Sequence, residues 1–502
     1  MSSTDTTTEA GGWTPRLVLS LVSMVLIIEA TTLGYTVASI GLPKITQEFP
    51  TDQAGWLLTS FILAGAVASA IVGKLADIFG KRRLMLFCLG IGLLGALLAA
   101  LAPSFGILIL ARALQGMVLP TMFLSYSLMR DVYPPAILPM ATAISMTGIG
   151  VFSVFVPFGA GWLLDTFGWR GLFAFDVVWI LCLGPLLAIT TPESQVRVRA
   201  RIDFLGGALL GIGLGVLLYG VSSAGTKGWT SGSTMGFLAV GMLMLAGFVA
   251  RSLNYSAPIV DLRIFVRRGI LLAALTAGSV YAASAVHASL SPMIGMTSRE
   301  IGGDYGLGLS AAEYGWVSAP QAIFMVIAGV VVGRTLNRFG AAALMKAGLA
   351  IFTLGALQLA FNHDTYWQVL IGTVLLGAAT GLAYGSIPGL VIVSAPAKQQ
   401  ASIAGMVQVT YNSIASTAPI VAFAILAGHI SFSSEAGAVY SSEGFKVGYL
   451  FTAGITMAGL ILALTVLRTR RKNLTLDAIR DESLEPPIAA ASQGAPTVRA
   501  TD

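Results

Sequence analysis

Charged side chains are scarce in this chain. Only 10% of its 502 residues are Asp, Glu, Lys or Arg, whereas 56% are hydrophobic. A soluble domain is about 25% charged, and 29 basic and 23 acidic residues cannot cover the surfaces of two or three globular domains. The composition therefore excludes a soluble protein, and the apolar residues must face lipid. The net charge of +6 does not indicate a nucleic-acid partner, because basic residues of membrane proteins gather in cytoplasmic loops.

Residues that carry redox or metal chemistry are also few. The two cysteines, Cys88 and Cys182, lie in apolar runs, which excludes a disulfide framework and a thiolate metal site. The three histidines are too scattered to form a metal-binding set. A phosphate-binding loop is missing, so ATP is not the expected energy source. We expect no cofactor and no metal, and an intramembrane enzyme finds little support.

Apolar runs long enough to cross a bilayer recur along the whole chain. About 20 helical residues span roughly 30 Å of hydrocarbon. The sequence therefore predicts an all-α membrane protein with fourteen transmembrane helices. These helices are expected near residues 17–40, 54–73, 84–102, 105–129, 138–164, 171–190, 203–223, 233–253, 270–293, 314–333, 342–361, 367–394, 401–429 and 446–467.

Basic residues in the loops set the expected orientation. With the amino terminus inside, the cytoplasmic loops hold basic clusters such as those at 81–83 and 197–201, whereas the outer loops hold few. The bias alternates through every loop, and one missed or extra span would invert it from that point on. Both termini are predicted to be cytoplasmic, in a bacterial inner membrane. Residues 1–16 and 468–502 are predicted to be disordered.

The sequence contains an internal repeat. Residues 55–84 and 315–344 both open with Gly-Trp, carry a glycine seventeen residues after the tryptophan, and close with another glycine seven residues later. The offset is 260 residues at every landmark, which predicts two related halves. The predicted domains are two pseudo-symmetric six-helix bundles, residues 17–190 and 270–467. Residues 191–269 would hold a linker and two inserted helices.

The loop between the second and third spans carries a recognisable motif. The run GKLADIFGKRR, residues 73–83, resembles the signature loop of the major facilitator superfamily, and the fourteen spans resemble its drug:proton antiporter group. The glycines allow closely packed helices to turn tightly, and the basic cluster holds the loop in the cytosol. The resemblance implies a gating motif made of Gly73, Asp77, Gly80, Arg82 and Arg83. Within it, Asp77 is expected to join a charge relay that latches the outward-open state.

Two further runs resemble motifs of the same family. Residues 112–116, RALQG, resemble its span-four motif, whose arginine is linked to proton transfer. Residues 156–164, VPFGAGWLL, resemble the span-five motif of antiporters. The resemblance implies that Pro157, Gly159 and Gly161 form an antiporter-like motif, because small residues let helices approach closely in lipid.

Ionisable side chains inside spans are the candidate proton carriers, since a charge at the bilayer centre costs about 2.5–3.5 kcal/mol. Glu29 lies thirteen residues past Arg16, about 20 Å into the first span. Protons and a cationic substrate can compete for a buried carboxyl group; the alternative is a permanent structural ion pair. Arg112 is expected to pair with an acid or with backbone carbonyls on spans one or five, in a network with Gln115; the alternative is a snorkelling arginine without a functional role. Asp176 is either a proton relay or a solvated residue of the outer vestibule.

Polar and aromatic side chains at mid-span are candidates for a central cavity between the halves. Each of them could instead tie helices together. His287 is either a relay or a hydrogen-bonded interface residue, and Asp165 and Arg170 are interpreted as loop charges. The cavity candidates are Gln115, Tyr126, Tyr281, Gln321, Tyr384, Gln408, Tyr411 and Asn412.

The predicted function is proton-coupled efflux of amphiphilic compounds by alternating access. The two halves would rock about the cavity, and Glu29 would take a proton from outside as substrate leaves. The expected partners are an amphiphilic small molecule, protons and the lipid bilayer, with no nucleic acid, and the chain is expected to be a monomer. Two alternatives keep the fold: translocation of a lipid or envelope precursor, and proton-coupled uptake of a metabolite.

Overall fold

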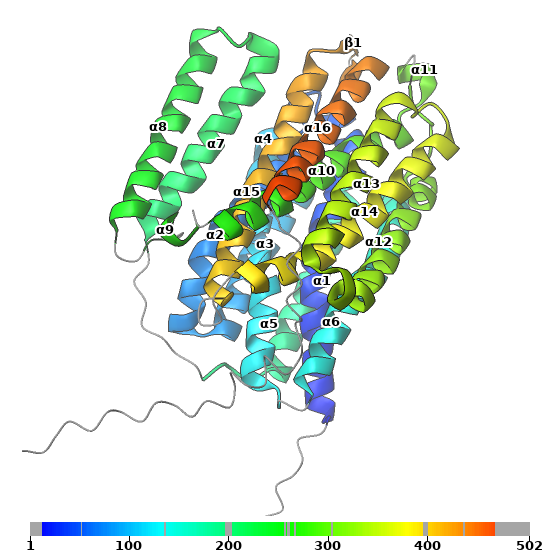
Figure 1. The fold of residues 1–502 in the computed structure, drawn as a ribbon. Helices are drawn as coiled ribbons and strands as arrows, with labels where there is room; N and C mark the ends of the chain where they lie inside the picture. The colour runs from blue at the N-terminus through cyan, green and yellow to red at the C-terminus, as the bar shows by residue number, and fades with distance from the viewer. Residues whose placement is uncertain are drawn as a thin grey trace, which may run out of the picture.

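A computed structural model describes residues 13–51, 53–134, 137–195, 203–255, 258, 262–265, 268–302, 305–394, 400–434 and 437–466. The described chain is almost entirely helical (Figure 1). Its helices are α1 (Pro15–Glu48), α2 (Trp56–Phe79), α3 (Lys81–Ala100), α4 (Phe105–Gln115), η1 (Gly116–Val118), α5 (Pro120–Val132), α6 (Leu138–Thr190), α7 (Phe204–Lys227), α8 (Gly232–Asn254), α9 (Leu262–Phe265), α10 (Arg268–Met296), α11 (Arg299–Gly302), α12 (Ala311–Phe339), α13 (Ala341–Phe361), α14 (Tyr366–Ser394), α15 (Gln400–Ala427) and α16 (Ser442–Val466). A short antiparallel hairpin, β1 (Ile430–Ser434) and β2 (Gly437–Tyr440), joins α15 to α16.

Thirteen helical stretches of the described chain are long and apolar enough to cross a membrane. One of them belongs to α6, whose 53 residues would extend about 80 Å if straight, more than twice the hydrocarbon thickness. The helical geometry of α6 breaks at Gly168, where φ is 69° and ψ is −178°. We call residues 138–167 the first arm of α6 and residues 169–190 the second arm. The all-α membrane fold is confirmed, while the count of fourteen spans stays a prediction.

The internal repeat has the same backbone conformation in both copies. Gly80 ends α2 with φ at 110°, and Gly340 ends α12 with φ at 81°. Side chains with a Cβ avoid this region of φ, so glycine is required at both turns. In each copy the next helix begins at the following residue, Lys81 or Ala341.

The start of α1 corrects one expectation. Pro15 and Arg16 were expected in a disordered lead-in, but they form the first turn of α1, where Thr14 accepts a hydrogen bond from the amide of Leu17 at 3.3 Å. The expected disorder of residues 1–12 and 468–502 lies outside the described residues. The boundaries of the two bundles stay predictions.

Two sets of contacts between the sequence halves lie toward the end of the bundle opposite the start of α1, which we call the far end. There α2 packs on α15, and Thr59 in the first turn of α2 donates a hydrogen bond to the carbonyl of Ser416 at 2.9 Å. The first arm of α6 packs on α12, and Asp165 accepts hydrogen bonds from the amides of Ala311 and Ala312 at 3.2 and 2.9 Å. Asp165 is therefore a cap on α12 and not the loop charge expected from sequence.

The α7–α8 hairpin stands beside the bundle, next to α2 and α15 (Figure 1). Leu214 and Leu218 of α7 join Leu63 of α2 and Ile420 of α15 in one apolar cluster. The hairpin therefore bridges a helix of each sequence half.

Candidate functional site

Glu29 lies in the middle of α1, and its carboxyl group has no hydrogen-bond partner in the part of the chain that the structure describes. The residue is 1% exposed, and neither carboxylate oxygen has a hydrogen-bond partner within the described residues. The hydroxyl of Tyr126 on α5, within electrostatic reach of Glu29, is also buried and has no hydrogen-bond partner among the residues described. An unpaired buried charge is costly, so this carboxyl group requires a proton or a ligand. The expected alternative, a permanent ion pair, is not what the structure shows for Glu29.

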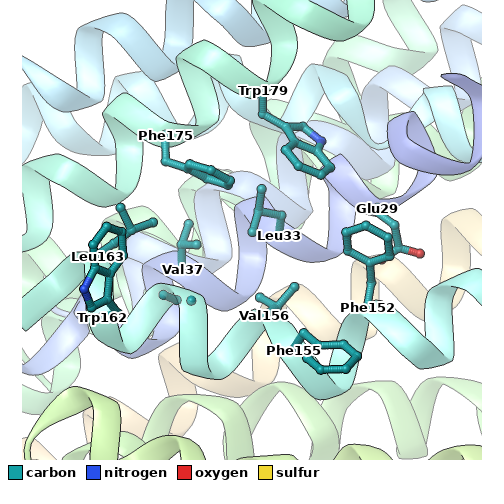
Figure 2. Close-up of a pocket in the computed structure, with 12 residues that line it drawn as sticks. Glu29, Leu33, Val37, Phe152, Phe155, Val156, Trp162, Leu163, Phe175 and Trp179 are labelled. Atoms are coloured by element: carbon teal, nitrogen blue, oxygen red, sulfur yellow. The ribbon is translucent and has the colours of Figure 1, made fainter.

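Glu29 lies at one end of an apolar cavity of about 280 Å³, which we call the α6 groove (Figure 2). Leu33 and Val37 follow Glu29 at intervals of four residues, so all three share one face of α1 and form the floor. The two arms of α6 form the walls. Glu29 is the one ionisable residue among the lining residues. The others are Phe152, Phe155, Val156, Gly159, Ala160, Trp162 and Leu163 from the first arm and Phe175 and Trp179 from the second.

Arg112 on α4 is fully buried and anchored to α2. Its Nε donates to the carbonyl of Leu57 at 3.1 Å, and its guanidinium lies 4.4 Å from the centre of the Phe61 ring. Its Nη1 donates to Oε1 of Gln115 at 2.7 Å, as their spacing of three helical residues allows. The shared network with Gln115 was expected. The backbone carbonyl, however, comes from α2 and not from span one or five.

Gln115 bridges Arg112 to a buried acid. Its Nε2 donates to Oδ2 of Asp176 on the second arm of α6 at 3.2 Å. Asp176 is only 5% exposed, which argues against the solvated alternative for this residue. Gln115 and Asp176 also line a small cavity of about 10 Å³. A role of Arg112 or Asp176 in proton coupling stays a prediction.

A second cavity, of about 180 Å³, lies where the two halves meet. Its walls come from α1, the first arm of α6, α10 and α12, and it is more polar than the α6 groove. His287 is buried there, with Nδ1 at 3.1 Å from the Tyr449 hydroxyl and Nε2 at 3.3 Å from Oε1 of Gln321. The structure thus shows His287 as a buried, hydrogen-bonded residue, and its role as a relay stays a prediction. The lining residues are Tyr35, Thr36, Ser39, Ile40, Pro157, His287, Ala288, Ser291, Tyr314, Ser318, Gln321, Ala322 and Met325; we call this cavity the interface pocket.

Three of the expected cavity residues stack on one another, and their place in a cavity stays a prediction. The ring of Tyr281 on α10 lies 4.2 Å from that of Tyr384 on α14 and 4.0 Å from that of Tyr411 on α15, with interplanar angles of 16° and 7°. The stack ties three helices together. Of the eight candidates, Gln321 lines the interface pocket and Gln115 the small cavity. The three stacked tyrosines line none of the three cavities described above, and neither do Tyr126, Gln408 and Asn412.

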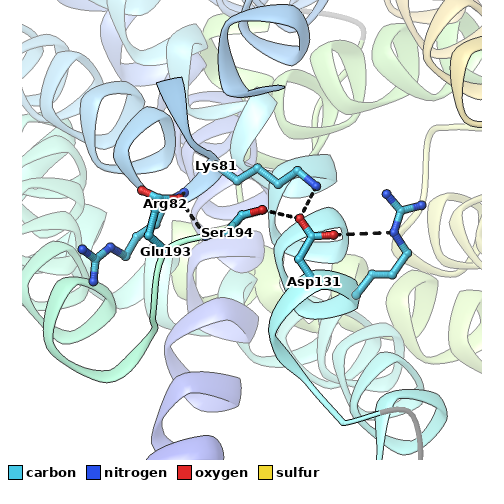
Figure 3. A network of polar contacts seen from close by, with 6 residues as sticks. Lys81, Arg82, Asp131, Glu193 and Ser194 are labelled. Carbon is cyan, nitrogen blue, oxygen red and sulfur yellow. Dashed lines mark hydrogen bonds and ion pairs between the residues drawn. The ribbon is translucent and has the colours of Figure 1, made fainter. Parts of the chain in front are cut away.

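The turn between α2 and α3, which carries the predicted gating motif, is hydrogen-bonded to the end of α6. The carboxylate of Glu193, which lies beside Arg82 in Figure 3, accepts hydrogen bonds from the backbone amides of Arg82 and Arg83, both at 3.0 Å. These amides lie in the first turn of α3, so Glu193 caps that helix and complements its dipole. The Arg82 side chain donates to two carbonyls at the end of α6, at 3.1 and 2.8 Å. Gly73 faces the Phe123 ring across the gap to α5. The side chain of Asp77 lies outside the described residues, so its relay role stays a prediction.

A buried ion pair completes this end of the bundle. Lys81 Nζ lies 2.5 Å from Oδ2 of Asp131, which also accepts a hydrogen bond from the Ser194 hydroxyl at 2.5 Å (Figure 3). The side chains of Lys81 and Asp131 are 3% and 7% exposed. The pair thus joins α3 to the end of α5 and to the segment after α6.

The antiporter-like motif places its three residues on three different surfaces. Pro157 lines the interface pocket. Gly161 lies against α12, where a Cβ would approach the carbonyl oxygen of Ala311 to 2.4 Å. Gly159 lines the α6 groove, and a Cβ added there would meet no atom within 4 Å. Close helix packing therefore requires glycine at 161 but not at 159.

Comparison with known proteins decides the family. A sequence model of the Major Facilitator Superfamily matches residues 24–303 and 288–496. The chain belongs to this superfamily. It is 26% identical over 457 residues to the uncharacterised MFS-type transporter YcnB of Bacillus subtilis, covering 88% of this chain and 93% of that protein. It is 28% identical over 405 residues to the multidrug resistance protein Stp of Mycobacterium tuberculosis, covering 78% and 71%.

A solved structure shares the superfamily fold. A bacterial homologue of the human lysosomal transporter Spinster, in an inward-facing and unoccupied conformation, has a TM-score of 0.63 at 16% identity, covering 91% of this chain and 99% of that chain. Members of the superfamily are integral membrane transporters of small molecules. This chain is therefore a membrane transporter and not an enzyme.

Sequence reasoning missed most of the lining of the α6 groove. Groove residues such as Phe152 and Trp179 are of the same apolar types as residues that face lipid. Residue type alone therefore does not distinguish the groove lining from the lipid-facing surface. The available signal was the spacing of Glu29, Leu33 and Val37 along one face of α1.

Proposed function

We propose that this transporter exports amphiphilic small molecules in exchange for protons and that Glu29 carries the proton. The observation that carries the proposal is a buried carboxyl group that has no hydrogen-bond partner among the described residues and lies at the end of an apolar groove. A proton and the polar group of a substrate are the two species that could satisfy it, so binding of one would displace the other. Similarity to a multidrug resistance protein supports efflux over uptake.

The distribution of contacts between the halves supports alternating access. The hydrogen bonds of Thr59 and Asp165 to the other half lie at the far end, which in the proposed orientation is the outer face. Breaking these contacts and forming new ones at the opposite end would expose the site to the outside. Inward movement of one proton would supply about 2.3 kcal/mol per 100 mV of membrane potential. We place the chain in a bacterial inner membrane, as a monomer with both termini cytoplasmic, in agreement with the loop charges.

Proteoliposomes with an imposed pH gradient test the proposal. Glu29→Gln should abolish gradient-driven efflux, whereas Glu29→Asp should retain part of it. Glu48→Gln is the matched control, because Glu48 lies on the same helix but is 41% exposed and pairs with Arg170 at 2.7 Å. Efflux by Glu29→Gln at the wild-type rate would show that another group carries the proton.

One observation favours a second candidate function. Apart from Glu29, the lining of the α6 groove is apolar or aromatic, which would also suit a lipid or an envelope precursor. Membranes from cells with and without the gene distinguish the two functions. A change in extracted lipids without a change in drug sensitivity would favour lipid translocation, and the opposite result would favour drug efflux.

A further inference from the structure

The first turn of α12 is completed by a residue of the other half. A helix start leaves its first backbone amides without partners inside the helix. Ser310 and Glu313 form a capping box, in which each side chain accepts a hydrogen bond from the amide of the other residue, at 3.2 and 2.9 Å. The amides of Ala311 and Ala312 lie between them in sequence and donate to the carboxylate of Asp165, at 3.2 and 2.9 Å. Part of the cap on α12 therefore comes from the first arm of α6.

The two helices approach each other closely at this point. Gly161 precedes Asp165 by one helical turn, and a Cβ added to it would lie 2.4 Å from the carbonyl oxygen of Ala311. A Cβ added to Gly315, one turn into α12, would lie 2.7 Å from the ring of Phe158. The carboxylate thus meets the positive end of the α12 dipole at a junction that exists only while the far end is closed.

The internal repeat supplies an equivalent contact that carries no charge. The offset of 260 residues relates α2 to α12, and adding 260 to residues 138–167 gives 398–427, which include α15. The pair of α2 and α15 therefore corresponds to the pair of α12 and the first arm of α6. Its hydrogen bond runs from the Thr59 hydroxyl to the carbonyl of Ser416 at 2.9 Å. Because a bond with an ionised partner is about twice as strong as a neutral one, the contact through Asp165 is expected to be the stronger of the two.

We propose that Asp165 is the outer latch of this transporter: its carboxylate holds the two halves together at the far end by capping α12, and this contact breaks when the transporter opens to the outside. The proposal rests on alternating access, as given in the proposed function. It adds a gating residue that acts through backbone amides of the other half and lines neither the α6 groove nor the interface pocket.

Distances between spin labels on the two halves test the latch. Nitroxides on Lys44→Cys and Asn362→Cys, with Cys88 and Cys182 replaced by alanine, report on the far end, because both label sites are exposed and lie where α1 and α13 end. The distance distribution is measured by double electron–electron resonance in lipid nanodiscs, without added ligand. We expect a short distance from closed molecules to dominate in the wild type, and a longer distance to mark molecules open to the outside.

Substitution of Asp165 should raise the ratio of open to closed molecules. Loss of a capping side chain shifts an equilibrium by roughly two- to thirtyfold, so Asp165→Ala should raise the ratio about tenfold. Asp165→Asn should raise it less, because the amide oxygen still accepts one hydrogen bond. Added salt should reduce the difference between wild type and Asp165→Asn, since it screens a charge at a helix start. An unchanged ratio in Asp165→Ala, or a wild type that is mainly open to the outside, would overturn the proposal.

Two matched variants separate a latch from an ordinary helix cap. Glu313→Ala removes the cap that α12 receives from its own half, so it should lower stability and leave the ratio unchanged. Thr59→Val removes the neutral bond between the halves and should raise the ratio less than Asp165→Ala does. Equal shifts in Asp165→Ala and Glu313→Ala would show that Asp165 only stabilises α12, and the latch would be wrong.

The latch and the proton role of Glu29 fail in different ways. If Asp165→Ala raises the ratio while Glu29→Gln still exports with the pH gradient, the proton role fails and the latch stands. If Glu29→Gln stops export while Asp165→Ala keeps the wild-type distance distribution, the latch fails and the proton role stands.

Discussion

The bridge through Gln115 offers the sharpest test of the buried network. Gln115→Leu preserves most of the side-chain volume but removes the acceptor for Arg112 and the donor for Asp176. Both partners are buried, at 0% and 5% exposed, so water cannot replace the lost contacts without a rearrangement. The substitution therefore leaves a guanidinium nitrogen and a carboxylate oxygen without partners.

The expected loss follows from the value of each contact. A hydrogen bond to a charged group contributes about 1.5–3 kcal/mol, so two of them predict a loss of about 3–6 kcal/mol. Arg112 keeps its bond to Leu57 and its position over Phe61, which favours the lower half of that range. The free energy of unfolding can be measured by titration with sodium dodecyl sulfate in mixed micelles, followed by circular dichroism.

Two further variants make the result interpretable. Gln115→Glu restores an acceptor for Arg112 but places a second carboxyl group beside the buried Asp176, so one of the two must be protonated. Its loss of stability should therefore grow as pH rises, whereas the loss in the leucine variant should depend less on pH. Gln368→Leu removes a glutamine that accepts hydrogen bonds from the amides of Asp364 and Thr365 at the exposed start of α14, and it should cost about 1 kcal/mol. If Gln115→Leu destabilises the protein no more than Gln368→Leu does, the network does not exist as described.

Three other predictions follow from local geometry. Gly161→Ala should destabilise the protein by about 1–3 kcal/mol because its Cβ would overlap the α12 backbone, whereas Gly159→Ala should be neutral in the same unfolding assay. Glu193→Gln should lower stability by about 0.5–1 kcal/mol through loss of charge at the start of α3, and the difference from wild type should shrink as salt is added. Gly80→Ala should cost about 1–2 kcal/mol, because φ at that residue is 110°, and Gly340→Ala should cost a similar amount.

Features written in short stretches of sequence were predictable. The lengths of the apolar runs gave the helices, because the bilayer fixes how many residues a span needs. The repeated glycines located two turns that do require positive φ, at Gly80 and Gly340. The spacing of Arg112 and Gln115 placed both side chains in one network, since residues three apart share a helix face.

Contacts between distant segments were not predictable in the same way. Asp165 caps a helix that begins 146 residues later, and nothing in its own neighbourhood distinguishes it from an ordinary loop charge. Lys81 and Asp131 are each flanked by other charges, so local sequence does not reveal which of them are buried together. The groove escaped detection because its lining and the lipid-facing surface have the same apolar composition.

The position of α1 offers a direct physical link between the groove and the interface between the halves. Glu29, Leu33 and Val37 face the α6 groove, while Tyr35 and Ser39 line the interface pocket and donate hydrogen bonds to carbonyls of α10. A helix is held by its own backbone hydrogen bonds and moves as a stiff rod over such short distances, so a shift of α1 against both α6 and α10 would change the groove and the interface pocket together. We infer that the ligand or proton on Glu29 can bias the arrangement of the halves through α1 and through the first arm of α6, which lines the groove and packs on α12. The Arg112 network, which joins α2, α4 and the second arm of α6, would then hold the scaffold against which α1 moves.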